Sequence, residues 1–216
     1  MKKIYALFAV VCFGLMANAQ TKSDPDAKKI LDGVSAKFRS FKSPQASFTY
    51  QIENAQGKVL ATKKGTVSMR GNKYHVTMGG MEIYSDGRTS WSYDKSANEV
   101  TVNGVDASGN AMTPQKLFTN FYDKDFLYKL NGEKKVSGKT VQEIEMTPTD
   151  KSRPFHKVYV YVDKAAGTLS SAKFLEKSGN RYSYSISAMK PNAAITESEF
   201  VFDKKKYPGV EVVDLR

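Results

Sequence analysis

Hydrophobic and polar residues alternate along most of the chain, which is the pattern of half-buried β-strands. Ala46, Phe48, Tyr50 and Ile52 show it first, each separated from the next by a polar residue. Further strands are predicted in the run through Val67 and Met69 and at residues 73–78, 99–102, 140–146, 156–162, 169–175, 181–186 and 199–202. The connections are rich in Gly, Asn, Asp and Ser, as short antiparallel turns require. This spacing predicts an antiparallel sandwich or barrel rather than a parallel sheet.

One helix is predicted ahead of the strands. Asp24 suits the N-cap position and Pro25 the first helical position. The apolar residues that follow recur at helical spacing: Ile30, Leu31, Val34, Phe38 and Phe41. Ser43-Pro44 ends the pattern. The helix is therefore amphipathic and must lay its apolar face on another element.

A second, short helix is predicted after a loop at residues 103–110. Thr113-Pro114 has the form of a cap followed by proline, and Leu117, Phe118 and Phe121 fall on one helical face. Such a helix could belong to the core or act as a movable lid. The sequence leaves both interpretations open.

The segment MEIYSDGRTSWSYD, residues 81–94, reads as a β-hairpin whose register decides which side chains share a face. A two-residue turn at Asp86-Gly87 would place Trp91 opposite Glu82. A three-residue loop over 85–87, with Gly87 in the left-handed conformation of a bulge, separates apolar from charged residues better. We predict this second form. One face then carries Met81, Ile83, Thr89, Trp91 and Tyr93, and the other carries Glu82, Arg88, Ser90 and Ser92.

The N-terminus has the form of a secretory signal peptide. Lys2 and Lys3 precede an apolar run over residues 4–16, and Ala17-Asn18-Ala19 places small residues at the positions that a signal peptidase reads. We expect cleavage after Ala19, because the apolar run is too short to span a membrane. Residues 20–216 are then expected to form a single domain. Cys12 lies in the signal peptide, so this domain has no cysteine and must rely on its hydrophobic core.

The charge of the chain is strongly positive, at +11, or +9 without the signal peptide. The lysines are scattered in pairs and triplets, which indicates solvated loops and strand ends or attraction to anionic lipids and acidic partners. Nucleic acid is an improbable partner for an exported protein.

No pattern of catalytic residues stands out. His75 and His156 lie far apart in sequence and have no metal-ligand spacing. A nucleophile elbow, a thiol nucleophile and a phosphate-binding glycine loop are all missing from the sequence. We therefore predict a protein that is not an enzyme and has no cofactor or metal site.

The chain resembles the outer-membrane lipoprotein carrier family, the LolA type. The resemblance rests on the amphipathic first helix leading to Gln45-Ala46-Ser47-Phe48-Thr49, the run from Gly65 to Tyr74, the Ser-Asp-Gly-x-Thr-x-Trp-x-Tyr core at residues 85–93, and the closing SEFVFDKKKYPGVEVVDLR. It implies a mainly β (α+β) fold, an unclosed antiparallel β-barrel with amphipathic helices forming a lid over a hydrophobic cavity.

For function, the resemblance implies a monomeric periplasmic carrier, or chaperone. Such a carrier receives acylated lipoproteins from an inner-membrane lipoprotein-releasing transporter and passes them to an outer-membrane receptor or to the outer membrane. The residues that we expect to line the cavity are Met69, Met78, Met81, Ile83, Trp91, Tyr93, Leu117, Phe118 and Phe121. Flexible methionines would suit cargo of variable shape.

Two residues match positions at the lid and the mouth. The family has an arginine that hydrogen-bonds helix carbonyls and holds the lid closed, and Arg70 stands in its place. Here Gly71 follows it where the family usually has proline, and alternation groups Arg70 with polar residues. Two roles for Arg70 therefore stay open: an inward latch and an outward surface residue. Tyr74 matches an aromatic residue near the cavity mouth.

Two other functions remain as alternatives. The first is an envelope sensor of the same fold that binds lipid or misfolded envelope protein and signals to an anti-sigma factor. Such relatives often carry an extra domain, so the length of this chain favours the carrier. The second is an envelope hydrolase, which the missing catalytic residues disfavour.

Overall fold

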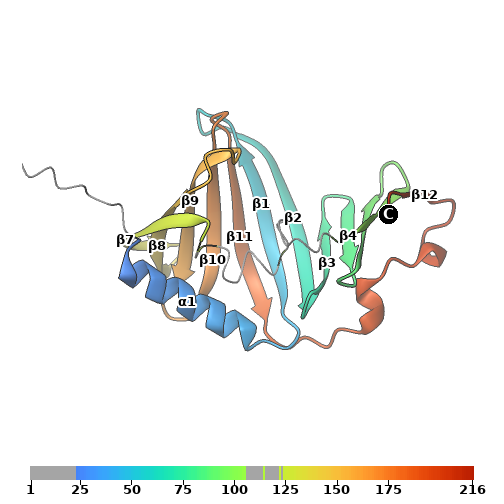
Figure 1. The fold of residues 1–216 in the computed structure, drawn as a ribbon, viewed down its shortest axis with the longest axis horizontal. Helices are drawn as coiled ribbons and strands as arrows, with labels where there is room; N and C mark the ends of the chain where they lie inside the picture. Colours follow the sequence, from blue (N-terminus) through green and yellow to red (C-terminus); the bar gives the residue numbers. More distant parts are fainter. Residues whose placement is uncertain (1–22, 106–113, 115–121, 123) are drawn as a thin grey trace, which may run out of the picture.

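The computed structural model describes residues 23–105, 114, 122 and 124–216, and it shows a strongly curled sheet with one α-helix against it (Figure 1). The helix is α1 (Pro25–Arg39). The strands are β1 (Gln45–Glu53), β2 (Val59–Arg70), β3 (Lys73–Met78), β4 (Met81–Ser85), β5 (Thr89–Asp94), β6 (Glu99–Gly104), β7 (Phe126–Val136), β8 (Lys139–Pro148), β9 (Phe155–Asp163), β10 (Thr168–Glu176), β11 (Arg181–Lys190) and β12 (Glu211–Asp214). Two 3-10 helices, η1 (Glu197–Phe200) and η2 (Lys204–Lys206), lie between β11 and β12.

The strands form one 12-stranded sheet in the order β12-β6-β5-β4-β3-β2-β1-β11-β10-β9-β8-β7. Neighbours are antiparallel except β12, which pairs parallel to β6. The order leaves β7 and β12 as free edges, so the sheet curls without closing. This confirms the predicted mainly β, unclosed architecture.

The first helix begins and packs as its sequence predicts. Asp24 is the N-cap, and its Oδ1 accepts hydrogen bonds from the backbone N–H of Asp26 (2.9 Å) and Ala27 (3.4 Å). Its Oδ2 accepts from the N–H of Leu130 in β7 (3.0 Å), and its own N–H donates to the Tyr128 carbonyl (2.9 Å). These bonds lower the pKa of the Asp24 carboxyl, chiefly through the Leu130 N–H. Asp24 thus ties the start of α1 to the edge strand of the sheet.

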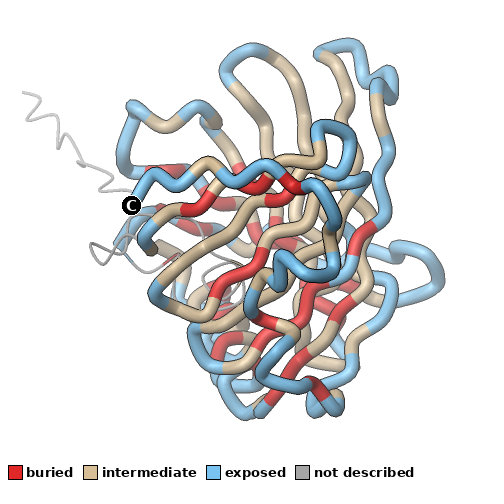
Figure 2. Tube along the Cα trace, turned by 90° about the vertical axis from the view of Figure 1, so that its right-hand side faces the viewer, coloured by how far each residue is buried: buried red, intermediate tan, exposed pale blue. Residues whose placement is uncertain are grey.

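Burial follows the strands, while the connections between them are exposed (Figure 2). We call the face of the sheet that looks toward α1 the cavity face and the opposite one the outer face. Residues paired directly across neighbouring strands point to the same face. The cavity face can be followed from β2 to β5 through successive paired residues: Val67, Val76, Ile83 and Ser92. Along this path its side chains change from apolar to polar.

The predicted register of the 81–94 hairpin is wrong. Tyr84 pairs with Trp91 and Glu82 with Tyr93, so Trp91 and Tyr93 lie on the outer face, opposite to Met81 and Ile83. The connection is longer than predicted, because Asp86 Oδ1 accepts from the N–H of Arg88 and Thr89 (both 2.8 Å) while Gly87 takes a φ of +89°. This side-chain turn shifts the register and reverses the faces.

In the observed register the Glu82 carboxylate shares the outer face with aromatic side chains, where hydrogen bonds stabilise it. Glu82 Oε2 accepts from the Tyr84 hydroxyl (2.5 Å), lies 3.2 Å from His75 Nε2 and accepts from the Tyr207 hydroxyl (3.3 Å). Phe202 and Tyr207 also cover Tyr93, with ring centroids 5.6 and 4.3 Å away. The C-terminal segment therefore packs on the aromatic face of the hairpin.

Three elements differ from the sequence expectation. The predicted strand at 199–202 is wrong, because Glu197–Phe200 forms η1. Two edge strands, β7 and β12, were not predicted. After Leu130, three of the six remaining residues of β7 are charged, and a register shift interrupts the strand between Leu130 and Gly132. The predicted second helix lies outside the described residues, apart from Pro114.

Candidate functional site

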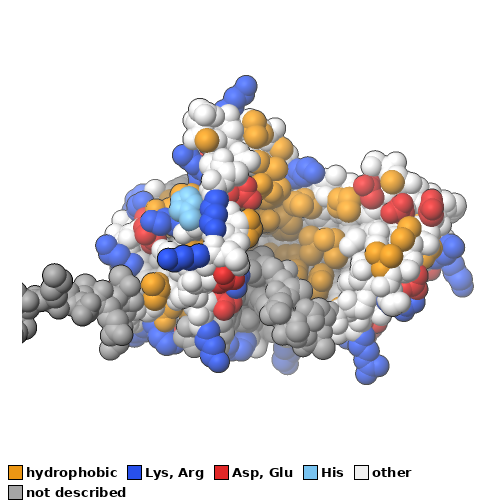
Figure 3. All heavy atoms as spheres, turned by 45° about the horizontal axis from the view of Figure 1, so that its top comes forward, with side chains coloured by type: hydrophobic (Ala, Val, Ile, Leu, Met, Phe, Trp, Pro, Cys, Tyr) orange, Lys and Arg blue, Asp and Glu red, His pale blue; other side chains and the backbone are white. Residues whose placement is uncertain are grey.

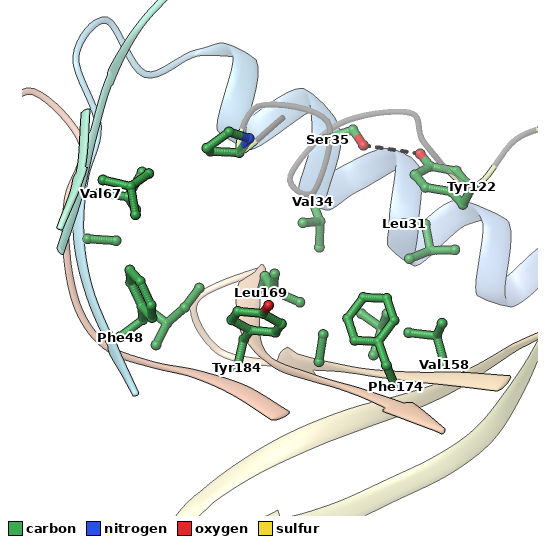
Figure 4. Close-up of a pocket in the computed structure, with 16 residues that line it drawn as sticks. Leu31, Val34, Ser35, Phe48, Val67, Tyr122, Val158, Leu169, Phe174 and Tyr184 are labelled. Atoms are coloured by element: carbon green, nitrogen blue, oxygen red, sulfur yellow. Dashed lines mark hydrogen bonds between the residues drawn. The ribbon is translucent and has the colours of Figure 1, made fainter. Parts of the chain in front are cut away.

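An apolar cavity lies between α1 and the cavity face of the sheet (Figure 4). It holds about 1030 Å³ of empty space, part of which is open to solvent. The lining residues are Leu31, Val34, Ser35, Ala46, Phe48, Val67, Val76, Pro114, Tyr122, Val158, Val160, Leu169, Ala172, Phe174, Tyr184 and Ile186.

The helix and the sheet contribute opposite walls. Leu31 and Val34 point from α1 toward the sheet, where Leu169, Phe174 and Tyr184 point back toward the helix (Figure 4). The helix stripe that the sequence predicts therefore faces the cavity. Since strand residues two apart share a face, β1, β9 and β11 supply their alternate side chains to the same space.

A glycine sets the position of one aromatic wall residue. Gly65 in β2 pairs directly with Phe48 in β1. A Cβ atom at Gly65 would lie 2.5 Å from Cζ of Phe48 and 2.4 Å from the Thr77 carbonyl oxygen. The phenyl ring therefore occupies the space that a larger side chain would need, and it forms the cavity wall beside Val67.

The polar side chains in the described wall are uncharged hydroxyls, and two of them, on Ser35 and Tyr122, are hydrogen-bonded. Ser35 Oγ lies 3.2 Å from the Tyr122 hydroxyl, which donates to Asp32 Oδ1 (2.8 Å). Burial raises the pKa of Tyr122 to about 12 and also raises the pKa of Tyr184. Both phenols therefore stay neutral at physiological pH. The described lining carries no charged side chain, so it suits an apolar ligand rather than an ionic one.

A row of aromatic rings continues from the cavity across the sheet. Tyr184 contacts Phe174 and Tyr50, with centroids 6.2 and 4.9 Å apart. Tyr50 stacks on Tyr182 at 6.0 Å, and Phe174 contacts Phe155 at 5.4 Å. Figure 3 shows hydrophobic side chains gathered in a hollow that opens where the top of Figure 1 is tilted forward. The cavity is thus accessible from one end.

None of the described residues that we predicted for the cavity lines it. Met69 lies on the cavity face, where it is buried against Phe38 and Val67 beyond the end of the cavity. Met78, Met81 and Ile83 also lie on this face, half-buried in β3 and β4. They continue the apolar surface past the cavity, and a contact of theirs with cargo stays a prediction.

Two more of the predicted cavity residues lie on the opposite side of the sheet. Trp91 and Tyr93 pack on the outer face with Val100 and Val210, so the hairpin reversal removes them from the cavity side. Leu117, Phe118 and Phe121 lie outside the described residues.

Arg70 points to the outer face. It pairs with Lys73, and its guanidinium donates to the Ile195 carbonyl and to Glu197 Oε1 (2.7 Å). Lys73 Nζ also binds Glu197, at 2.6 Å from Oε2. Arg70 therefore fastens the C-terminal segment to β2 and β3. The outward orientation is one of the two that the sequence left open, while the latch would have bound backbone carbonyls of a lid helix. Tyr74 lies on the cavity face, packed against the Met69 cluster, and burial raises its pKa.

The sequence contained a signal for the wall residues that we did not predict. Val158, Val160 and Val162 alternate in β9, as do Tyr182, Tyr184 and Ile186 in β11. This alternation identifies a buried face. It does not tell a wall that borders empty space from one that borders a packed core, so it could not locate the cavity.

Fold and cavity together define an open, curled-sheet binding protein with an uncharged interior. Residues 39–203 match the family described as "Outer membrane lipoprotein carrier protein LolA". The chain belongs to this family.

Relatives described as outer-membrane lipoprotein carrier proteins match most of the chain. The outer-membrane lipoprotein carrier protein of Cupriavidus necator is 26% identical over 218 residues, which cover 97% of this chain and 96% of the relative. That of Histophilus somni is 26% identical over 175 residues, covering 79% and 80%.

Solved structures share the fold. An uncharacterized conserved protein from Thermus thermophilus has a TM-score of 0.59 at 15% identity, covering 88% of this chain and 99% of that one. MucB has a TM-score of 0.51 at 18% identity, covering 88% of this chain and 66% of MucB. At these identities the likeness concerns the fold alone.

Proposed function

We propose that this protein is a periplasmic carrier that takes up the acyl chains of lipoproteins in the cavity beneath α1 and ferries them from the inner to the outer membrane. The observation that carries the proposal is the wall itself, which is apolar, uncharged and open at one end. Membership of the lipoprotein carrier family supports it.

The energetics explain why such a cavity is needed. Each buried methylene is worth about 0.8 kcal/mol, so an acyl chain of about sixteen carbons resists entering water by roughly 12 kcal/mol. A cavity lined by valine, leucine and aromatic side chains removes most of this barrier. Because the described part of the wall offers no charged anchor, the bound chain is free to leave for a membrane.

The partners follow from this role. An inner-membrane lipoprotein-releasing transporter would load the carrier, and an outer-membrane receptor or the outer membrane itself would unload it. The names of the relatives favour this function over an envelope sensor, since MucB shares only the fold. Binding and transport without catalysis is what membership of a carrier family leads us to expect.

The proposal is tested by release of a lipoprotein into solution. Inner-membrane vesicles that carry the releasing transporter and an acylated lipoprotein are mixed with the purified protein, and soluble complex is measured after the vesicles are sedimented. The test variant is Ala172→Phe, which places a ring in the cavity wall. Ala188→Phe is the matched control, because Ala188 is exposed on the neighbouring strand β11.

We expect soluble complex with the native protein and with Ala188→Phe, and a loss of about tenfold or more with Ala172→Phe. If the native protein releases no lipoprotein, or if both variants release it equally well, the cavity is not the acyl site.

A further inference from the structure

The hairpin between β1 and β2 exposes two apolar side chains at its tip. Val59 is 47% exposed and Leu60 is 58% exposed. The strand pairing passes from Ile52–Ala61 to Glu53–Val59, so Leu60 is the extra residue of a bulge. The bulge leaves Leu60 without a partner in the ladder.

This tip is held in a defined conformation. Asn54 Oδ1 accepts from the N–H of Gln56 (3.1 Å) and Lys58 (2.9 Å), and Gly57 takes a φ of +81°. The tip also packs on the β10–β11 turn, since a Cβ at Gly179 would lie 2.9 Å from the Ala55 Cβ. A fixed hairpin with outward apolar side chains loses little conformational entropy when it binds.

Basic residues surround the tip. Three turns and their adjoining strand ends lie at this end of the sheet, at residues 53–64, 149–154 and 173–181. The Lys177 N–H joins the last two by donating to the Pro154 carbonyl (2.9 Å). The three segments carry eight lysine and arginine residues against three acidic residues, which leaves a net charge of +5. One of the acids, Glu53, is paired with Lys173 at 2.8 Å. The exposed side chains of Val59 and Leu60 are therefore surrounded by an excess of positive charge.

The same end of the sheet carries the aromatic rim of the cavity. Tyr50 and Tyr182 stack between the tips and the cavity wall, and Tyr184 continues the row inward. In Figure 1 the β1–β2 and β10–β11 loops stand at the top, and Figure 3 shows the hollow from that side. Tyrosine, with an apolar ring and a polar tip, is the side chain that favours the headgroup layer of a membrane.

We propose that the β1–β2 tip docks the protein on an anionic lipid surface, with Val59 and Leu60 inserted, lysines on the headgroups and the cavity mouth turned to the membrane. The purpose of docking rests on the proposed carrier function, although vesicle binding itself does not require cargo. A lipid surface fits better than a protein partner, because two apolar side chains ringed by lysines are too small for a specific protein interface of about 800 Å² per side.

The test is flotation of the exported protein, with its N-terminus established by mass spectrometry, on phosphatidylcholine vesicles with or without phosphatidylglycerol. We expect binding to the anionic vesicles that falls about tenfold in Leu60→Asn. The Lys58→Gln, Lys63→Gln and Lys64→Gln changes together should weaken binding by about fivefold per lysine.

Matched controls lie at the other end of the molecule. Leu215 is 63% exposed, so Leu215→Asn removes an equally exposed leucine, and Gln at Lys204, Lys205 and Lys206 removes equal charge. Neither control should change binding by more than about twofold. As a second measurement, brominated lipid should quench fluorescence more in Leu60→Trp than in Leu215→Trp.

The docking proposal is overturned if the native protein does not bind anionic vesicles, and a protein partner would then be sought. It is also overturned if the control variants weaken binding as much as the test variants. Binding of a fluorescent fatty acid in solution separates this proposal from the carrier function. Leu60→Asn should keep it, whereas Ala172→Phe should lose it and still float with the vesicles.

Discussion

The two ends of the sheet bury opposite faces. At one end, β7 to β11 turn valine, isoleucine and phenylalanine toward α1 and present Glu143, Glu145, Tyr159 and Tyr161 on the outside. At the other end, β4 to β6 turn Tyr84, Trp91 and Tyr93 outward beneath the C-terminal segment. On their cavity face, Met81 and Ile83 of β4 are followed by the polar residues Ser92 of β5 and Thr101 of β6.

The two ends also differ in how fully they are packed. The outer cluster at Tyr93 is filled by Phe202, Tyr207 and Val210. The space under α1 keeps a cavity whose wall is just as apolar. Apolar side chains in this fold therefore serve two purposes. At one end they provide stability, and at the other they leave room for a ligand.

The largest expected change in the free energy of unfolding comes from the filled cluster around Tyr93. Tyr93→Ala removes a ring that is 5% exposed and contacts Phe202 and Tyr207. We expect the free energy of unfolding in urea to fall by about 3–5 kcal/mol. Acyl binding per folded molecule should stay unchanged. A loss below about 1 kcal/mol would contradict the description of this end as a packed core.

The next largest difference is expected when a larger side chain is introduced at each end of the sheet. Val100 is fully buried in the filled cluster, and Val100→Phe should lower the free energy of unfolding by about 1–3 kcal/mol through overpacking. Ala172→Phe adds a ring where the structure has empty space, so it should cost less than about 1 kcal/mol. Urea unfolding of both variants measures the difference. Equal losses would mean that the cavity is not available space.

Gly65→Ala probes the wall between the two ends. Because its Cβ would meet the Phe48 ring and the Thr77 carbonyl, we expect the free energy of unfolding to fall by about 1–3 kcal/mol. Displacement of Phe48 should also weaken acyl binding, as measured by fatty-acid fluorescence. The double change Phe48→Leu with Gly65→Ala should recover part of the stability, and a failure to do so would leave the Thr77 carbonyl as the main obstacle.

A smaller effect is expected where the C-terminal segment is fastened. Arg70→Gln removes the ion pair with Glu197 and weakens the bond to the Ile195 carbonyl. Since exposed ion pairs contribute about 0–1 kcal/mol, the loss in unfolding free energy should be about 1 kcal/mol or less. Hydrogen exchange should rise in the C-terminal segment and stay unchanged in α1. Faster exchange in α1 alone would favour the helix latch.

The last expected effect appears only at alkaline pH, at the cavity end. Burial raises the pKa of Tyr122 to about 12 from its ordinary value of about 10. The folded state holds this proton more tightly than the unfolded state, so the contribution is complete below about pH 10 and is lost as pH rises toward 12. Tyr122→Phe should flatten the fall in unfolding free energy between about pH 9 and 12. An unchanged slope would contradict the buried position of this hydroxyl.

Local patterns predicted most of the fold. The cap at Asp24, the helical stripe and the alternation in β1 each depend on neighbouring residues only, and the structure contains them as expected. β7 escaped prediction because an edge strand with one solvated face carries charged residues such as Lys129 and Glu133. β12 is four residues long and owes its strand conformation to its pairing with β6.

The site was harder to predict because it depends on register and on distant segments. The Asp86 turn moved Trp91 and Tyr93 to the outer face, and the segment that covers them there comes from more than 100 residues later. Sequence alternation showed that Glu82 would share a face with aromatics in this register. It could not show that the hydroxyls of Tyr84 and Tyr207 would stabilise the carboxylate.

The most direct test of the central claim is to locate a bound acyl chain by photo-crosslinking. A fatty acid with a diazirine near its methyl end is bound to the protein and irradiated, and mass spectrometry then maps the modified residues. The account predicts adducts on the cavity walls, among them Phe174, Tyr184 and Val158. Adducts confined to Trp91, Tyr93 and Phe202 would show instead that the ligand occupies the aromatic cluster of the outer face and would contradict the account.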